Sequence, residues 1–242
     1  MRKIDIREKL KEIDFSLDTI SLGDFDYIGN FTARKNRDKN SDLYKTAGCF
    51  FRPNYERGIL IYALITTFKI DSYLEIGFGR GYSALCAAKA MCDMGIDGKV
   101  ITIDPNIDEE FLKNLLNVLP KEWFSKIEFM KGLSEVALPE IEGNFDLIYV
   151  DGDHRYEEVK KDWEMTKDRF NKFILFDDYV NRPVKDIECA RVIDEIDEEK
   201  ELITMDRRIF LDDRNLSDSE IDYGQVLIKN KRFNIDDYLL VW

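Results

Sequence analysis

Five residues whose side chains can do acid–base or metal chemistry follow two apolar segments of this chain. Asp151, Asp153 and His154, the only histidine, come after FDLIYV, and Asp177 and Asp178 come after FILF. Crowded carboxylates repel one another unless a positive charge neutralises them. Oxygen ligands suit a hard divalent cation, most simply Mg²⁺ with water in its remaining positions. We therefore predict a metal site at Asp151, Asp177 and Asp178. The alternative is that Asp177 or Asp178 caps the next segment and no metal binds.

A second pattern, LEIGFGRGYS over 74–83, runs from a short apolar strand through a glycine-rich turn into a helix of small residues. Glu75, Gly77, Gly79 and Gly81 stand two residues apart. Glycine permits positive φ angles and close approach of a ligand, and the helix N-terminus attracts an anionic or zwitterionic group. Dinucleotide-binding turns read G-x-G-x-x-G, whereas Tyr82 stands here at the last glycine position. The turn therefore favours a different cofactor, unless it is a plain strand-to-helix connection.

Two further residues extend the expected cofactor site. Asp104 ends the segment KVITID 23 residues after Gly81, close to the spacing at which a carboxylate meets the hydroxyls of a ribose. Ser134 follows the next apolar segment and could bond the edge of an adenine. The alternative for Asp104 is a simple Asp-Pro turn.

The elements that must position these residues alternate regularly. Strands are predicted at 72–76, 99–104, 126–130, 145–150 and 173–177, and helices at 55–68, 83–94, 108–118 and 155–170. Such alternation predicts a parallel sheet with helices on both faces, and its ligands bind beyond the carboxyl ends of the strands. The tail differs, because the segments 207–212 and 224–230 have no helix between them. We expect them to form an antiparallel pair that closes one edge of the sheet.

The first 50 residues are mixed. An amphipathic start precedes the polar stretch 33–42, which is expected to be a loop or lid. Its basic residues Arg34, Lys35 and Arg37 could hold an anionic substrate, or the loop could simply be solvated. We divide the chain into an N-terminal helical cap and lid, 1–54, and one compact domain, 55–242.

The composition limits the partners. With 49 acidic and 36 basic residues the net charge is −13, which would repel nucleic acid and anionic membrane surfaces. No apolar run approaches the ~20 residues needed to cross a membrane, and the charged N-terminus does not resemble a secretion signal. Four cysteines without a C-x-x-C pair are typical of a reducing compartment. We expect a cytoplasmic protein and leave open whether it forms a homo-oligomer.

Taken in order, EIGFGRGYSAL, the Gly-x-Ser at Gly132–Ser134, DGDHRYE and FDDY resemble the metal-dependent O-methyltransferases of class I. The resemblance covers about residues 55 to 180. It is strongest to the group that includes macrolide- and aminocoumarin-sugar methyltransferases and cephalosporin-hydroxylase-like proteins. It implies a Rossmann-like, doubly wound, mostly parallel sheet, S-adenosylmethionine as the methyl donor, and a small-molecule hydroxyl acceptor such as a sugar.

The resemblance also implies roles for single residues. Glu75, Gly77 and Ser83 would surround the methionine part of the cofactor, Asp104 the ribose and Ser134 the adenine, while Asp151, Asp177 and Asp178 would bind the metal. The full expected cofactor-binding set is Glu75, Gly77, Gly79, Gly81, Ser83, Asp104, Ser134 and Asp151.

Two residues compete for the role of general base. Sugar-modifying members of the group have an aspartate at the position of Asp153. Catechol-type members have a lysine at the position of His154, and this chain lacks it. Both residues therefore remain candidate catalytic groups, and a hydrogen-bonding role for His154 is the alternative.

The sequence thus predicts Mg²⁺-assisted methylation of a small-molecule hydroxyl. Three other functions stay open: a metal-independent methyltransferase acting on nitrogen or a carboxylate, a nicotinamide-dependent oxidoreductase on a similar sheet, and a regulatory module that binds the cofactor without turnover.

Overall fold

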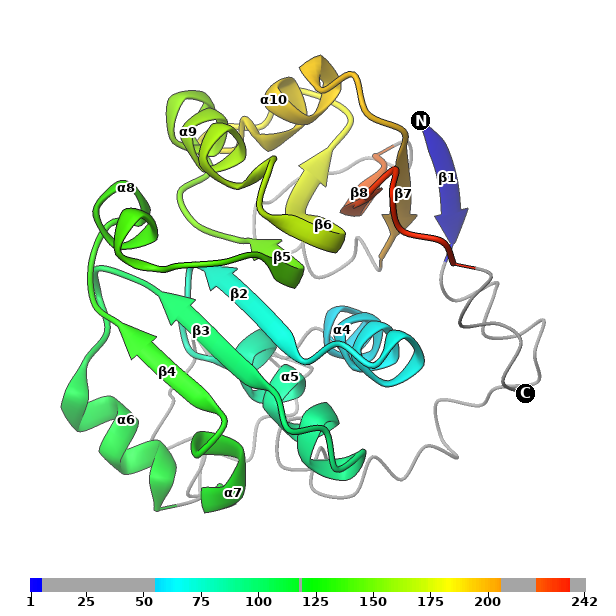
Figure 1. The fold of residues 1–242 in the computed structure, drawn as a ribbon. Coiled ribbons are helices and arrows are strands. Elements are labelled where there is room, and N and C mark those ends of the chain that lie inside the picture. Colours follow the sequence, from blue (N-terminus) through cyan, green and yellow to red (C-terminus); the bar gives the residue numbers. More distant parts are fainter. Residues whose placement is uncertain (6–54, 118, 206–220, 236–242) are drawn as a thin grey trace.

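A computed structural model describes residues 1–5, 55–117, 119–205 and 221–235 (Figure 1). Its centre is an eight-stranded sheet in the order β1-β7-β8-β6-β5-β2-β3-β4. All neighbouring strands are parallel except where β8 pairs with β6 and β7. The strands are β1 Arg2–Asp5, β2 Ser72–Ile76, β3 Lys99–Ile103, β4 Ile127–Met130, β5 Phe145–Val150, β6 Phe170–Val180, β7 Lys200–Thr204 and β8 Tyr223–Lys229.

Helices cover both faces of this sheet (Figure 1). On one face α4 packs against α5, and α5 against α7; on the other, α10 packs on β6 and against α9. The bounds are α4 Tyr55–Phe68, α5 Tyr82–Asp93, α6 Glu109–Leu116, α7 Lys121–Phe124, α8 Ser134–Ala137, α9 Tyr156–Thr166 and α10 Cys189–Glu195, with a 3₁₀ turn at Leu138–Glu140. This is the predicted doubly wound, Rossmann-like arrangement. No helix among the described residues combines the length and apolarity that a membrane crossing requires.

The central strands are apolar because both of their faces are covered. Every residue of β5 is buried, as are four of the five residues of β2. Parallel strands between helix layers have this continuous apolar character. The carboxyl ends of β2 and β5 lie side by side, with Ile76 in register with Val150. The turn after β2 and the loop after β5 therefore meet at the same edge.

Two expectations about the elements are corrected. The helix predicted over 155–170 ends at Thr166, and Phe170 begins β6 instead, in register with Phe145 of β5. The segment 224–230 does form an antiparallel strand, but its described partners are β6 and β7. It lies inside the sheet, where it does not close an edge. The expected strand 207–212 lies outside the described residues.

The first residues also differ from the expected helical cap. Arg2–Asp5 form the edge strand β1, parallel to β7. The remainder of the expected cap and lid, including Arg34, Lys35 and Arg37, lies outside the described residues.

Candidate active site

A cavity of about 520 Å³ opens at the carboxyl ends of β2, β3 and β5. This size is ordinary for a small-molecule or cofactor site. Its walls come from the turns that follow these strands and β4, together with Arg57 of α4 and Asp162 of α9. The lining segments are 76–80, 82–83, 103–106, 132–135 and 151–155. The glycine turn and the aspartates after β5 thus share one cavity.

The glycine turn needs glycine for steric reasons. Gly77, Gly79 and Gly81 have φ angles of 95°, 51° and 83°. A Cβ at Gly77 would also overlap the backbone carbonyl of Asp151. The Gly77 amide donates to the carbonyl of Ile103 over 2.8 Å, which ties the turn to β3. Gly77 and Gly79 line the cavity, and Gly81 is the N-cap of α5.

Glu75 lies beneath this turn and is fully buried. Its carboxylate accepts hydrogen bonds from Ser83, which lines the cavity, and from Oγ1 of Thr102 at 2.8 Å. Burial raises the pKa of Glu75 to about 8, while these two hydroxyl groups oppose the shift. Through its hydrogen bonds with Ser83 and Thr102, Glu75 therefore links the start of α5 to β3 beneath the glycine turn.

Asp104, the residue expected to bind the ribose, lines the cavity. One carboxylate oxygen accepts from the Gly79 amide at 3.0 Å and the other from the Asn106 amide at 2.7 Å. Each oxygen keeps a lone pair for a ligand hydroxyl, because a carboxylate oxygen accepts more than one hydrogen bond. Ser134 also lines the cavity, and its Oγ donates to Oδ1 of Asp162 at 2.5 Å.

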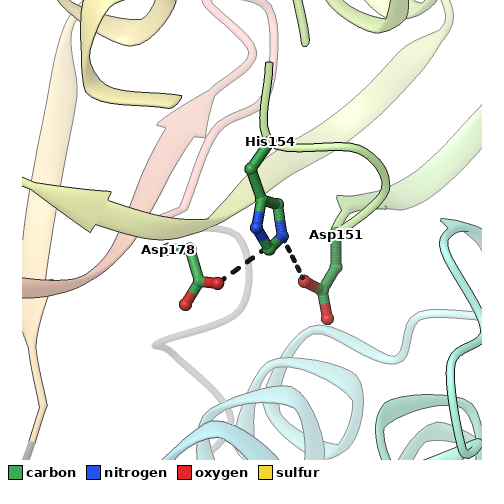
Figure 2. Close-up of side chains that lie close together, drawn as sticks. All are labelled: Asp151, His154 and Asp178. Atoms are coloured by element: carbon green, nitrogen blue, oxygen red, sulfur yellow. Dashed lines mark ion pairs between the residues drawn. The ribbon is translucent and has the colours of Figure 1, made fainter. Parts of the chain in front are cut away.

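Asp151, His154 and Asp178 form a compact cluster (Figure 2), and the first two of them line the cavity. Nε2 of His154 lies 3.8 Å from Oδ1 of Asp151 and 3.5 Å from Oδ2 of Asp178. One ligand atom from each of the three residues lies within 4.8 Å of the others. Burial disfavours the imidazolium, but the two carboxylates outweigh it and raise the pKa of His154 to about 9.

Asp177, expected to be a metal ligand with Asp151 and Asp178, has other partners. Its Oδ2 lies 2.5 Å from Nη2 of Arg57 and accepts from the Tyr149 hydroxyl at 2.8 Å. Burial raises the pKa of Asp177, and the guanidinium opposes that shift. The structure therefore brings His154, in place of Asp177, together with the other two aspartates.

Asp178 is held in a different way from Asp177. The register of β6 and β8 shifts between Phe176 and Tyr179, and Asp178 has a φ of 49°. Its Oδ1 accepts from the Tyr223 hydroxyl at 2.9 Å. Positive φ is uncommon for a residue other than glycine and costs energy. Because of this irregularity, the adjacent side chains of Asp177 and Asp178 reach different partners.

Asp153, the other candidate base, is engaged by its neighbour. Its two carboxylate oxygens accept from Nε and Nη2 of Arg155 over 2.6–3.0 Å. This pair lowers the pKa of Asp153. Asp153 lines the cavity, with its side chain 44% exposed.

Comparison with known proteins bears on this arrangement. Residues 74–179 match a family described as a methyltransferase domain. That range begins at the strand leading into the glycine turn and ends just after Asp178. The part of the chain that carries the glycine turn, Asp104 and the cluster is therefore similar to a methyltransferase domain. A search of curated protein sequences found no match.

Solved structures share the fold of this chain at low sequence identity. The O-methyltransferase TomG from Streptomyces achromogenes is 16% identical, with a TM-score of 0.56 over 79% of this chain and 90% of its own. An O-methyltransferase from Bacillus cereus is 16% identical, with a TM-score of 0.55 over 78% and 87%. The O-methyltransferase NovP is 14% identical, with a TM-score of 0.51 over 88% and 96%.

Sequence reasoning missed several polar residues of this site. They are Arg57, Tyr149, Asp162, Tyr223 and Gln225. One available signal was strand alternation, because adjacent strand residues point to opposite faces and would not both reach one metal. The other signal was Asp162, an aspartate on the buried side of α9. It lies about one helical turn after Val159 and one before Thr166.

Proposed function

We propose that this protein is a methyltransferase that transfers the methyl group of S-adenosylmethionine to a hydroxyl oxygen of a small molecule. The observation that carries the proposal is the cavity that joins the glycine turn and Asp104 to Asp151 and His154, which form a cluster with Asp178. The three similar structures are each named O-methyltransferases, and that of TomG contains SAM and is described as involved in tomaymycin synthesis. Hydroxyl methylation is consistent with both findings.

The protein's part in this reaction is positioning and proton removal. The sulfonium of the donor already makes its methyl group electrophilic, so the acceptor oxygen must be held in line with it and lose a proton. Holding two reactants in the correct geometry can supply ~7–11 kcal/mol of the barrier. The cofactor end would hold the donor through Gly77, Gly79 and Asp104, and the cluster would receive the acceptor.

His154 is the base that the geometry favours, acting in its neutral form, which is the minor form below its pKa of about 9. Its ring lies beside the carboxylates of Asp151 and Asp178, which would stabilise the imidazolium formed on proton transfer (Figure 2). Asp153 is the weaker candidate, because its pairing with Arg155 lowers its pKa and occupies both of its oxygens. General-base catalysis typically contributes about 10²–10⁴-fold.

The same cluster fits a divalent cation. Two carboxylates and one imidazole, one ligand atom from each within 4.8 Å of the others, are a common donor set for such ions. Asp151, His154 and Asp178 would hold the ion, with Asp177 left to Arg57. When bound, the cation would stabilise negative charge on the acceptor oxygen. A His154 that binds metal cannot accept the proton, so that form would leave Asp153 as the base.

The first test concerns the cofactor. Isothermal titration with S-adenosylhomocysteine should show binding to the wild-type protein and at least about tenfold weaker binding to Asp104→Ala, since removing a charged acceptor costs ~1.5–3 kcal/mol. Glu164→Gln, an exposed change on α9, is the control. Absence of binding, or equal binding by Asp104→Ala, would contradict the cofactor site.

The second test concerns the reaction and the metal. A mass-spectrometric screen of sugar and phenol acceptors should find a product heavier by one methylene that survives mild base, as a methyl ether does and a methyl ester does not. A product methylated on nitrogen or on a carboxylate would support the alternative class. Activity that persists both in excess EDTA and in Asp178→Ala would exclude a required metal.

A further inference from the structure

The hydroxyl group of Tyr223 reaches the cluster of Asp151, His154 and Asp178 from β8, 45 residues after Asp178 in the sequence. Tyr223 is 7% exposed, and its hydroxyl donates to Oδ1 of Asp178 at 2.9 Å. Nη2 of Arg57 in turn donates to the same hydroxyl at 3.3 Å. Arg57, Tyr223 and Asp178 therefore form a chain of two hydrogen bonds that leads into the cluster.

The chemistry of the three groups fixes the direction of this chain. A guanidinium can only donate hydrogen bonds, so the Tyr223 oxygen must accept from Arg57. A tyrosine hydroxyl keeps its single proton at neutral pH, and an ionised carboxylate can only accept. The proton of Tyr223 is therefore directed at Asp178.

The two oxygens of Asp178 consequently have different surroundings. Oδ1 accepts from Tyr223, whereas Oδ2 lies 3.5 Å from Nε2 of His154 (Figure 2). A carboxylate that is held at one oxygen does not rotate freely. The bond from Tyr223 therefore decides which oxygen of Asp178 meets His154.

Tyr223 also holds Asp178 without neutralising it. Nη2 of Arg57 lies 2.5 Å from Oδ2 of Asp177 but 3.6 Å from Oδ1 of Asp178. A guanidinium neutralises the carboxylate with which it pairs, whereas an uncharged hydroxyl orients a carboxylate and leaves its charge in place. The charge of Asp178 thus stays available to His154 or to a bound cation.

We infer that Tyr223 is a positioning residue, which directs Oδ2 of Asp178 toward His154 by donating a hydrogen bond to Oδ1. The catalytic consequence rests on the proposed function, because the orientation matters to methyl transfer only if His154 and Asp178 act on the acceptor. Without the hydroxyl, the carboxylate can turn toward Arg57 and away from His154.

The orientation can be tested without any acceptor, because His154 is the only histidine of the chain. In untagged protein made with isotope-labelled histidine, every imidazole NMR signal comes from this one ring. Spectra at about pH 5, well below the ordinary pKa of histidine, keep both ring protons in place in every variant. Tyr223→Phe removes only the hydroxyl group and should shift the His154 signals.

Tyr179→Phe is the matched control. Tyr179 directly follows Asp178, is 5% exposed, and donates to a different carboxylate, Oδ1 of Asp194, at 3.2 Å. Its loss of a buried hydroxyl should leave the His154 signals at their wild-type positions. Circular dichroism and thermal unfolding check that both variants fold.

A double-mutant cycle distinguishes positioning from a general change in packing. In an Asp178→Ala background, Tyr223→Phe should shift the His154 signals no further, because the carboxylate through which it acts is gone. An equal further shift would overturn the inference. Unchanged His154 signals in a folded Tyr223→Phe protein would also overturn it.

Asp178→Asn serves as the second variant if Tyr223→Phe does not fold. Tyr223 must still donate, so it should hold the carboxamide oxygen and turn the amide NH₂ group toward His154. The His154 signals should then match those of Asp178→Ala. Signals between those of Asp178→Ala and the wild-type protein would mean that the oxygen faces His154, and the inference would fail.

The catalytic consequence is measured with an acceptor found in the mass-spectrometric screen. Tyr223→Phe should lower kcat about tenfold or more, the typical effect of removing a group that orients a metal ligand. The KM for S-adenosylmethionine should stay within about twofold, since the residues of the cofactor end are unchanged. An unchanged kcat would refute the role in catalysis. If the wild-type protein methylates no acceptor, the proposed function fails, while the His154 signals still decide whether Tyr223 orients Asp178.

Discussion

The two ends of the candidate site are built by different means. The cofactor end is shaped by the backbone: glycines with positive φ, amides that donate to Asp104, and a turn fixed to β3 by the Gly77 amide. The acceptor end is shaped by ionised side chains, with Arg57 beside Asp177 and Asp178, and His154 beside Asp178. One end depends on local conformation and the other on charges contributed by distant segments, so the two should respond to different perturbations.

The largest effect is expected from breaking the buried ion pair of the acceptor end. Arg57 and Asp177 have side chains only 16% and 2% exposed. Removing one partner of such a pair leaves an uncompensated buried charge, so Arg57→Met should lower the free energy of unfolding by about 4 kcal/mol. Urea denaturation would measure this loss.

A double-mutant cycle checks that the loss comes from the pair. Arg57→Met combined with Asp177→Asn should cost clearly less than the sum of the two single changes, because no isolated charge remains. Additive losses would show that the two side chains do not act as a pair.

At the cofactor end the corresponding test is steric. Gly77→Ala should lower the free energy of unfolding by about 3 kcal/mol, because the new methyl group overlaps the Asp151 carbonyl in a strained backbone conformation. Gly143→Ala is the matched control, with a φ of 89° and open space around its Cβ. It should cost only about 1 kcal/mol, the price of positive φ alone. Equal losses would mean that close approach to Asp151 does not matter.

The pH dependence of the free energy of unfolding should reflect the titration of Glu75, the buried carboxyl group beneath the glycine turn. Glu75 has a pKa of about 8 in the folded protein against an ordinary 4.5, with repulsion from Asp151 and Asp104 adding to burial. Between these values the native state binds more protons than the unfolded state, so stability falls as pH rises.

The isosteric change Glu75→Gln should remove part of that fall, on the order of 2 kcal/mol between pH 5 and pH 8. Denaturation midpoints of both proteins across this range would measure it, with Glu164→Gln as the exposed control. A wild-type curve that rises over this range, or an unchanged fall in Glu75→Gln, would contradict the assignment.

The difference between the two ends also explains what could be predicted from the sequence. The glycine turn and Asp104 were expected to meet the cofactor because their geometry follows from local spacing and strand order, and both line the cavity. The central strands were placed correctly for the same reason. The partner of β8 was misplaced because β7, KELIT, is short and mixed in polarity, and sheet order is a non-local property.

At the acceptor end, the partners of Asp177 and Asp178 could not be predicted, because nothing in the sequence distinguishes two adjacent aspartates. Asp177 is neutralised by Arg57, which lies on α4 more than a hundred residues earlier, and no local pattern links the two. The shift in β6 between Phe176 and Tyr179 decides which aspartate faces His154. Such a shift depends on pairing with β8, so strand alternation indicates that the two side chains diverge but not which of them faces His154.

The smallest expected effect isolates that backbone irregularity. At Asp178, φ 49° favours glycine over other residues, so Asp178→Gly should be more stable than Asp178→Ala by about 1 kcal/mol, although both lose the Tyr223 hydrogen bond. At Asp177, in an ordinary strand conformation, the order should reverse, because glycine in a strand is unfavourable by ~0.5–1 kcal/mol. Urea denaturation of these four variants would give both differences. If alanine were the more stable at both positions, the backbone conformation at Asp178 would not be what orients its side chain, and side-chain contacts alone would do so. Positive φ angles would then shape only the cofactor end.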